Sequence, residues 1–312
     1  MLKVYKYTPG QATGLTNAVL ALGFFDGVHK AHRELIKTTL EVAEKEGLTP
    51  AVFTFTAEGK IKSDKPRLYS TEERLYILES LGIEHVVLVD FEDISDLSAE
   101  DFVTVSLVEH FGAKAVVAGY NFRFGRRASG DTAILTELME RSGGRAYIKE
   151  EILADGRTIS TTLIRSYLTE GDVETSRDLL VTPYFISGRV ESGNRVGKTL
   201  GFPTINIPLA DNAINLRRGV YLTAVKIGDK LFKGLTNVGT CPTFNERKMH
   251  TETYILDYNS EIYGEEVKIF FLEFIREERK FESPEALKSE INKNIKAAME
   301  RKIPSWQEIG LK

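Results

Sequence analysis

Two of the five histidines in the chain, His29 and His32, lie only three residues apart. They follow the apolar run 18–22, which predicts a buried strand, and precede residues 34–46, whose spacing predicts a helix. In an open parallel sheet such a strand-to-helix turn lies at the carboxyl edge, where ligands bind. The free N–H groups and dipole of the helix start favour phosphate, and imidazoles there can donate hydrogen bonds to a triphosphate. The turn therefore predicts a phosphate site, the simpler alternative being two solvated histidines.

Two later segments could converge on this turn. Residues 117–125 leave an apolar run and enter a loop with Asn121, whose amide can hydrogen-bond a ligand, followed by two arginines that can pair with phosphate. Residues 159–165 supply hydroxyls at a helix start and a guanidinium, Arg165, within its first turn. Read singly, these segments are also consistent with an exposed basic loop and an ordinary helix cap.

Glycines recur in one segment of the second half of the chain. Gly193, Gly197 and Gly201 surround Lys198 and predict a loop that folds over phosphates. The segment is not a Walker motif, because Ser192 stands where that motif has its first glycine.

Thr204 and Asn206 follow on an extended segment. Residues two apart on a strand point the same way, so their two oxygens share a face. Two neutral oxygens, completed by water and ATP phosphates, suit Mg²⁺. A Thr-x-Asn sequence on its own is more commonly a turn.

The elements expected around the histidine turn alternate between strands and helices. Strands are predicted at 19–22, 51–55, 85–90, 115–119 and 145–148, and helices at 34–46, 71–81, 98–111 and 132–141. Ser70 and Ser98 precede acidic first turns, as helix caps do. This alternation predicts a parallel, doubly wound α/β sheet in the first half.

The pattern changes near Pro183. Short β-rich runs then cover 184–190, 219–227, 230–238, 251–257 and 267–275. Their spacing predicts a small antiparallel barrel, and a terminal helix is expected at 284–301 with Ser283 as its cap. The predicted domains are residues 1–182 and 183–312.

The motifs of the first half, taken in order, resemble a known family. Gly-x-Phe-Asp-Gly-x-His-x-x-His, Asn-Phe-x-Phe-Gly and Ile-Ser-x-Thr-x-Ile-Arg are similar to the nucleotidyltransferase half of bacterial bifunctional riboflavin kinase/FAD synthetases. The resemblance covers about residues 15–180 and implies a Rossmann-like fold that transfers AMP from ATP to FMN, giving FAD and pyrophosphate. It implies catalytic roles for His29, His32 and Asn121, with Asn121 near the reacting phosphates or the flavin and Phe122 beside the flavin. The ATP-binding residues that it implies are Gly23, Phe25, Asp26, Gly27, His29, His32, Ser160, Thr161 and Arg165.

One position departs from that family. Its His-x-Gly-His is here His29-Lys30-Ala31-His32. Alanine adds a Cβ and disfavours a positive φ, so adenylyl transfer would weaken if the site needed either freedom at this position.

The segment Gly-Phe-Pro-Thr-x-Asn, residues 201–206, resembles the signature of riboflavin kinases. Supporting matches lie at 218–221, 237–243, 252–257 and 274–281. The resemblance implies a six-stranded barrel with Mg²⁺ and ATP at Thr204 and Asn206, and a nucleotide site that includes Gly193, Gly197, Lys198 and Asn237. It implies that Glu252 is the base that accepts the proton of the ribityl hydroxyl.

The same resemblance places Arg276 in a loop that closes on the flavin. The alternative is a surface ion pair. Glu252 also has a simpler alternative, an exposed carboxylate on a strand.

Composition limits the remaining function classes. The chain has 312 residues, which favours two domains, and a net charge of -4, which argues against a broad nucleic-acid surface. A single cysteine, Cys241, fits a reducing compartment, and we find neither a membrane-length apolar run nor a signal peptide. We expect a cytoplasmic protein, a monomer or weak homo-oligomer, whose partners are small molecules.

The sequence predicts a bifunctional enzyme with ATP as co-substrate, which makes FMN from riboflavin and then FAD from FMN. Two alternatives stay open. One is a riboflavin kinase with weakened or lost adenylyltransferase activity, suggested by Ala31. The other is a flavin-binding regulatory protein without turnover, against which the joint presence of Thr204, Asn206 and Glu252 argues.

Overall fold

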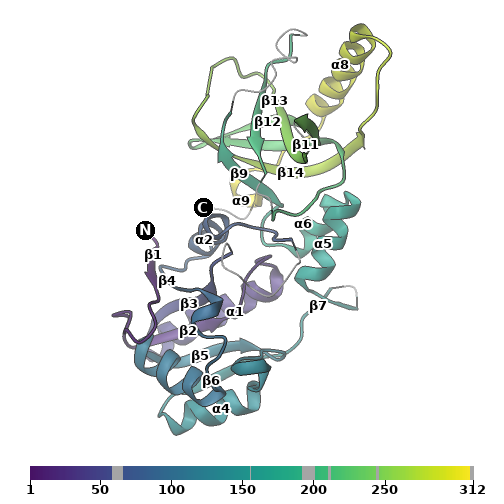
Figure 1. Ribbon diagram of the computed structural model, residues 1–312. Helices are drawn as coiled ribbons and strands as arrows, with labels where there is room; N and C mark the ends of the chain where they lie inside the picture. The colour runs from purple at the N-terminus through teal and green to yellow at the C-terminus, as the bar shows by residue number, and fades with distance from the viewer. Residues whose placement is uncertain (58–65, 155, 192–200, 210–211, 244–245, 310–312) are drawn as a thin grey trace. The chain divides into compact units, whose positions relative to one another are not determined.

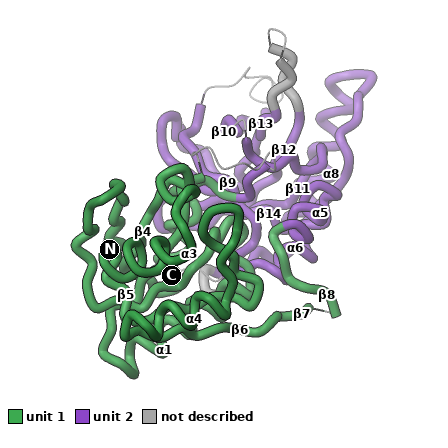
Figure 2. Tube along the Cα trace, turned by 60° about the horizontal axis from the view of Figure 1, so that its bottom comes forward, with its two compact units in different colours: residues 1–65, 69–161 green, residues 66–68, 162–312 purple. Residues whose placement is uncertain are grey.

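The computed structural model describes residues 1–57, 66–154, 156–191, 201–209, 212–243 and 246–309, with the backbone alone at 240–243, 246–248 and 306–307. The chain divides into two compact units (Figure 2). Residues 1–65 and 69–161 form the first unit, and residues 66–68 and 162–312 form the second. The division thus falls ahead of residue 182, and the domain boundary there stays a prediction. No helix in these described ranges is long and apolar enough to cross a membrane.

The first unit is built on a six-stranded sheet in which every neighbouring pair is parallel (Figure 1). Its strand order is β1-β4-β3-β2-β5-β6. The strands are β1 (Lys3–Lys6), β2 (Ala18–Leu22), β3 (Thr49–Phe55), β4 (His85–Val89), β5 (Ala113–Gly119) and β6 (Arg145–Lys149). The chain moves from β2 outward to β4 and then returns to the other side of β2, which confirms the predicted doubly wound sheet.

Helices connect these strands as the sequence predicts. They are α1 (Lys30–Glu46), α2 (Thr71–Ser80), α3 (Ala99–Asp101), which continues as the π-helix η2 (Phe102–His110), and α4 (Thr132–Arg141). Ser70 and Ser98 cap α2 and α3 by accepting hydrogen bonds from the backbone of Glu73 and Asp101. All five residues of β2 are buried, so the strand that ends at the histidine turn lies in the centre of the core.

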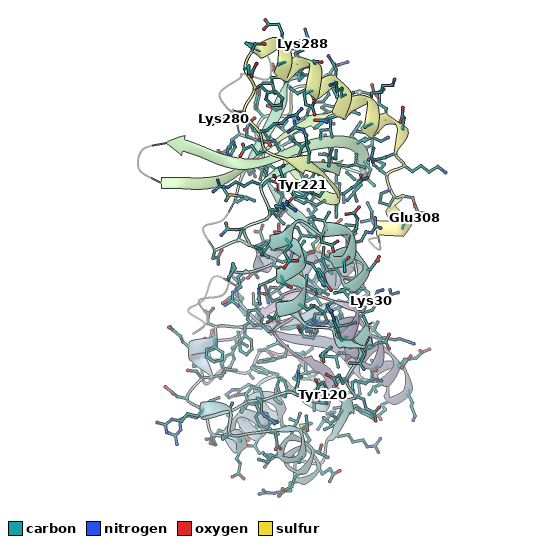
Figure 3. The ribbon with its side chains drawn as sticks, turned by 90° about the vertical axis from the view of Figure 1, so that its right-hand side faces the viewer. Lys30, Tyr120, Tyr221, Lys280, Lys288 and Glu308 are labelled. Carbon is teal, nitrogen blue, oxygen red and sulfur yellow. The ribbon has the colours of Figure 1, made fainter. Side chains whose placement is uncertain are left out.

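The second unit is a six-stranded antiparallel sheet in the order β10-β13-β12-β11-β14-β9. The strands are β9 (Phe185–Arg189), β10 (Thr204–Pro208), β11 (Gly219–Ile227), β12 (Lys230–Thr243), β13 (Glu246–Ile255) and β14 (Glu266–Glu277). A backbone bridge from Glu191 to Asn206 brings the two edges of the sheet together and closes the predicted barrel. Tyr221, labelled in Figure 3, is fully buried in this unit and packs edge-on against Phe271 and Phe274.

Four helices complete the described part of this unit. They are α5 (Thr161–Glu170), α6 (Val173–Leu179), α8 (Pro284–Glu300) and α9 (Trp306–Ile309). Ser283 caps α8 as predicted, and the Lys233 ammonium donates to carbonyls at its other end, those of Ala298 and Met299. The sequence did not predict α6, which packs against β14.

Candidate active sites

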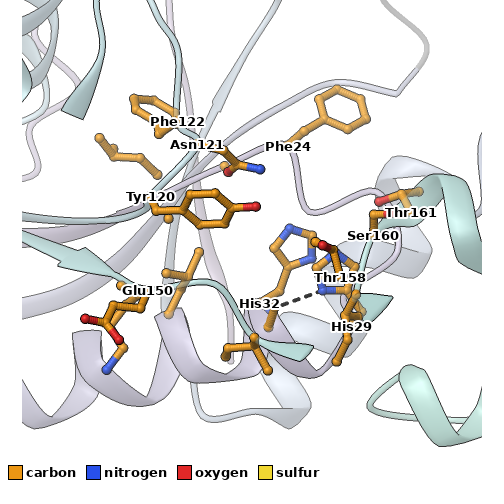
Figure 4. A pocket seen from close by; sticks show the side chains of 18 of the residues that line it. Phe24, His29, His32, Tyr120, Asn121, Phe122, Glu150, Thr158, Ser160 and Thr161 are labelled. Carbon is orange, nitrogen blue, oxygen red and sulfur yellow. Dashed lines mark hydrogen bonds between the residues drawn. The ribbon is translucent and has the colours of Figure 1, made fainter. Parts of the chain in front are cut away.

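A pocket of about 420 Å³ opens in the first unit at the carboxyl ends of β2 and β5 (Figure 4). These strands are neighbours in the sheet although β3 and β4 separate them in sequence, so the pocket lies where the strand order reverses. Seven of the residues expected from the sequence line it: Gly23, His29, His32, Asn121, Phe122, Ser160 and Thr161. In Figure 4 the two imidazoles lie between Tyr120 and Asn121 on one side and Ser160 and Thr161 on the other.

The histidines form a stacked pair at the start of α1. Their ring centroids are 3.8 Å apart with an angle of 13° between the planes. His29 is the N-cap of α1, and its Nδ1 accepts a hydrogen bond of 3.4 Å from the backbone of His32. This cap explains why α1 begins at Lys30, ahead of the predicted residue 34.

Burial makes both imidazoles poor bases. It lowers the pKa of His29 to about 4. The pKa of His32 also lies well below its ordinary value, first because of burial and second because of the neighbouring His29. At neutral pH both rings are therefore uncharged in the free protein and can offer N–H donors to a ligand. Within the described residues, His32 Nδ1 is buried and has no hydrogen-bond partner.

The turn between β2 and α1 is strained. Phe25 and Val28 have φ values of 54° and 34°, in the left-handed region that bulky residues avoid. Phe25 is fully buried and its ring centroid lies 4.8 Å from that of His32. Strain of this kind is commonly held at functional sites. Phe25, Asp26 and Gly27 are buried within the turn and do not line the pocket, so their predicted contact with ATP remains a prediction.

Arg74 of α2 holds this turn and was not found by sequence analysis. Its side chain is 1% exposed. One guanidinium nitrogen donates to the carbonyl of Phe24 at 2.8 Å, and the other donates to the carbonyl of Phe55 at 2.6 Å. The rings of Phe24 and Phe55 stack at 6.0 Å, and both residues line the pocket. Only the tertiary structure brings Arg74 to this place, since nothing in its helix pattern marks it.

Tyr120 lies on the opposite side of the pocket from Ser160. Its hydroxyl donates to Glu151 at 2.7 Å, and the Thr158 hydroxyl donates to the same carboxylate oxygen at 2.5 Å. These bonds connect the loop after β5 to β8 (Arg157–Thr158). Sequence analysis missed both Tyr120 and Thr158 because neither lies in a recognisable motif.

Arg165 and Ala31 take positions that the sequence left open. Arg165 lies on α5, its Nε donates to the carbonyl of Pro66 at 2.8 Å, and it is not among the residues that line the pocket. Its predicted role at the phosphates remains a prediction.

Ala31 lines the pocket from the first turn of α1, and its φ is not among the positive values. The backbone there does not require glycine.

The second unit has a pocket of about 300 Å³ against α8. Four of the expected residues line it: Thr204, Asn237, Glu252 and Arg276. Strand register explains this gathering, because Glu252 of β13 lies opposite Asn206 of β10 on one side and Asn237 of β12 on the other. Residues opposite each other on neighbouring strands point to the same side of a sheet.

The row of Asn206, Glu252 and Asn237 faces away from the barrel interior. Thr236 and Thr253, the neighbours of this row along β12 and β13, are completely buried, and their hydroxyls bond to each other at 2.9 Å inside the barrel. Asn206 shares the face of Glu252 but is not among the residues that line the pocket. Gly193, Gly197 and Lys198 lie outside the described residues.

Arg276 lies on β14 and not in the expected loop, and α8 holds its side chain. Its Nε donates to the Asn294 side chain at 3.0 Å and lies 3.6 Å from the Glu290 carboxylate. Arg279 pairs with the same carboxylate at 2.5 Å. Burial lowers the pKa of Arg276, and Glu290 opposes that effect. Arg276 thus makes an ion pair, which was the alternative to a role in closing on the flavin, and it also lines the pocket.

The fold and the two pockets define a two-unit enzyme, with one site at the switch point of a Rossmann-like sheet and another on a small barrel. The models of two families match the chain: FAD synthetase over residues 12–163 and riboflavin kinase over residues 180–302. The chain belongs to the bifunctional riboflavin kinase/FMN adenylyltransferase family.

Two curated relatives and one solved structure are similar to this chain over most of its length. The Bacillus subtilis bifunctional riboflavin kinase/FMN adenylyltransferase is 33% identical over 90% of this chain and 92% of its own. The Listeria monocytogenes protein of the same name is 34% identical over 89% of this chain and 90% of its own. A crystal structure titled macrolide-efflux protein, from Streptococcus pneumoniae, superposes with a TM-score of 0.84 at 28% identity, covering 96% of this chain and 99% of that one.

Proposed function

We propose that the pocket of the first unit transfers AMP from ATP to FMN and that the pocket of the second unit phosphorylates riboflavin. The observation that carries this proposal is that each pocket gathers one of the two sets of motif residues. His29, His32 and Asn121 meet in the first pocket, and Thr204, Asn237 and Glu252 meet in the second.

Adenylyl transfer needs positioning and charge stabilisation more than a covalent nucleophile. An oxygen of the FMN phosphate attacks the α-phosphorus of ATP, and the bond to pyrophosphate breaks. His29 and His32 donate hydrogen bonds to the phosphate oxygens on which charge gathers. The N–H groups at the start of α1 support them, because a helix start binds anions. Asn121 orients the flavin phosphate, and Phe122 lies beside the flavin.

Phosphorylation of riboflavin needs a base. Glu252 accepts the proton of the ribityl hydroxyl. The oxygen of that hydroxyl attacks the γ-phosphorus of ATP, and ADP leaves. The hydroxyl of Thr204 and the amide oxygen of Asn206, on the face that carries Glu252, are donors that fit Mg²⁺, which would neutralise phosphate charge there. Asn237 and the segment with Gly193, Gly197 and Lys198 contact the nucleotide, and Arg276 contacts the flavin.

The proposal extends to the setting of the enzyme. Riboflavin, FMN and ATP are its partners in the cytoplasm, and it acts as a monomer or weak homo-oligomer without nucleic acid. The single cysteine and the net charge of -4 support this setting.

Incubation of the purified protein with riboflavin, ATP and Mg²⁺, followed by chromatography of the flavins, tests the proposal. We expect FMN to appear first and FAD to follow. Accumulation of FMN without FAD would favour the kinase with a lost adenylyl site. Binding of flavin without either product would favour the regulatory protein.

A further inference from the structure

His250 lies beside Glu252 in a position that the proposed mechanism does not use. The two residues are two apart on β13 and therefore project from the same face of the strand. His250 Nε2 lies 3.5 Å from Glu252 Oε1. The imidazole is three-quarters buried, with 25% of its side chain exposed, while Glu252 is more open at 40%.

The other nitrogen of the ring indicates which atom carries the proton. His250 Nδ1 is buried, and no described residue offers it a hydrogen-bond partner. A proton on Nδ1 would be buried without an acceptor and would leave the lone pair of Nε2 against the carboxylate oxygen, which is costly. A proton on Nε2 instead allows a hydrogen bond to Glu252 Oε1, which lies 3.5 Å away. This tautomer makes His250 a donor to Glu252.

The neighbours of His250 leave the ring little choice of partner. Across the sheet it lies opposite Pro208 of β10 and Gly239 of β12, neither of which has a polar side chain. The Glu278 carboxylate packs over Gly239, where an added Cβ would come within 3.0 Å of its Oε1. Glu252 is nevertheless the carboxylate with which His250 pairs among the described ion pairs, at 3.5 Å.

We propose that His250 is a positioning residue that holds one oxygen of Glu252 by donating from Nε2 and leaves the other oxygen free for the ribityl hydroxyl. This inference rests on the proposed role of Glu252 as the base. A hydrogen bond to a catalytic carboxylate is commonly long before substrate binds and tightens in the complex, as the 3.5 Å separation allows. A carboxylate held in one rotamer loses less freedom when it accepts the proton, so the benefit appears in kcat.

Two substitutions of His250 distinguish the effect of losing the N–H donor from the effect of losing the aromatic ring. His250→Phe keeps an aromatic ring and removes the donor, whereas His250→Gln keeps an N–H donor on a shorter side chain. We expect His250→Phe to lower kcat for FMN formation about 10- to 100-fold, the range for loss of an orienting partner, with the KM for riboflavin and for ATP little changed. His250→Gln should recover most of the rate. His250→Leu replaces His250→Phe if that protein does not fold.

The coupling to Glu252 is measured in a double-mutant cycle. In a Glu252→Gln background His250→Phe should cause no further loss, because the carboxylate to be oriented is gone. FAD formation from supplied FMN, assayed on each preparation, controls for protein quality. A full additional loss in the double variant, or an equal loss in His250→Gln and His250→Phe, would overturn the orienting role.

The rates of the two single variants distinguish a wrong role for His250 from a wrong role for Glu252. A slow Glu252→Gln protein beside a His250→Phe protein of parental rate would overturn the orienting role alone. A Glu252→Gln protein that phosphorylates riboflavin at the parental rate would overturn the base, and the orienting role with it.

Discussion

His29 and His32 are suited to bind phosphate as neutral donors. Their stacking at 3.8 Å would be repulsive if both rings were charged, and burial lowers the pKa of each. A neutral donor at a helix start still stabilises the charge that develops on a phosphate oxygen, because the site is preorganised.

His32→Ala should therefore remove most FAD formation and spare FMN formation. Loss of one preorganised donor typically costs about 100- to 1,000-fold in rate. The measurement is the initial rate of FAD formation from FMN and ATP, beside riboflavin phosphorylation on the same preparation. His85→Asn is a matched control, since His85 bonds to Tyr5 and does not line the pocket. Equal loss of both activities in folded His32→Ala protein would contradict the assignment.

The low pKa of His29 also predicts how stability depends on pH. The unfolded chain takes up a proton near pH 6.5 and the folded chain only near pH 4, so the unfolded state binds more protons between these values. Stability should fall as the pH falls through this window. At pH 5 the loss due to His29 alone is about 2 kcal/mol.

Urea unfolding of the parent and of His29→Gln at pH 7.5 and at pH 5 checks this expectation. The parent should lose more stability on acidification than the variant does. The same loss in both proteins would show that His29 titrates alike in the folded and unfolded chains.

The sequence predicted polar residues that line each pocket, and it missed several of the aromatic residues that line the first pocket. His29, Asn121 and Ser160 lie far apart in sequence but meet because each follows a strand or begins a helix at one edge of the sheet. Phe24 and Tyr120 line the same pocket, but aromatic residues in loops have no pattern that distinguishes them from packing residues.

At the scale of elements, the turn after β2 depends on α2. Arg74 reaches from α2 to the carbonyls of Phe24 and Phe55, and the Thr54 hydroxyl donates to the same Phe24 carbonyl at 2.8 Å. A buried side chain that binds one carbonyl of the turn and one at the end of β3 keeps the strained turn in place.

Arg74→Met should consequently lower FAD formation by about 10-fold or more, because a small displacement of a positioned group has a large effect on rate. FMN formation should not change. Ser80→Ala, at the other end of α2, is the control, since the Ser80 hydroxyl bonds only within its own helix among the described contacts. Unchanged FAD formation in Arg74→Met would show that the turn after β2 keeps its conformation without Arg74.

Regular elements were predicted best where pattern and boundary signals agreed. β11 and α4 match the predicted residues, and α8 ends one residue earlier than predicted. β1 was missed because four residues with exposed lysines at both ends carry little hydrophobic pattern. α6 was missed because seven residues make too short a helix for periodicity to show; Asp172 caps its start, and its packing on β14 stabilises it.

At the scale of the whole molecule, the second unit should work alone. We expect a fragment of residues 183–312 to fold and phosphorylate riboflavin. A fragment of residues 162–312 should be more stable, because α6 packs against β14 and the backbone N–H of Arg217 bonds to Leu168 of α5. Melting curves and FMN formation by both fragments are the measurements. A folded fragment 183–312 without kinase activity, beside an active full chain, would contradict the predicted boundary.

The central claim is that two separate sites on one chain act in sequence. Mixing His32→Ala protein with Glu252→Gln protein tests it most directly, with riboflavin, ATP and Mg²⁺ as the only substrates. Alone, the first variant should stop at FMN and the second should leave riboflavin nearly unchanged, since loss of a general base costs about 100- to 10,000-fold. Together they should produce FAD, because FMN released by one protein reaches the intact adenylyl site of the other. Failure of the mixture to form FAD, when each variant retains its own remaining activity, would contradict the account.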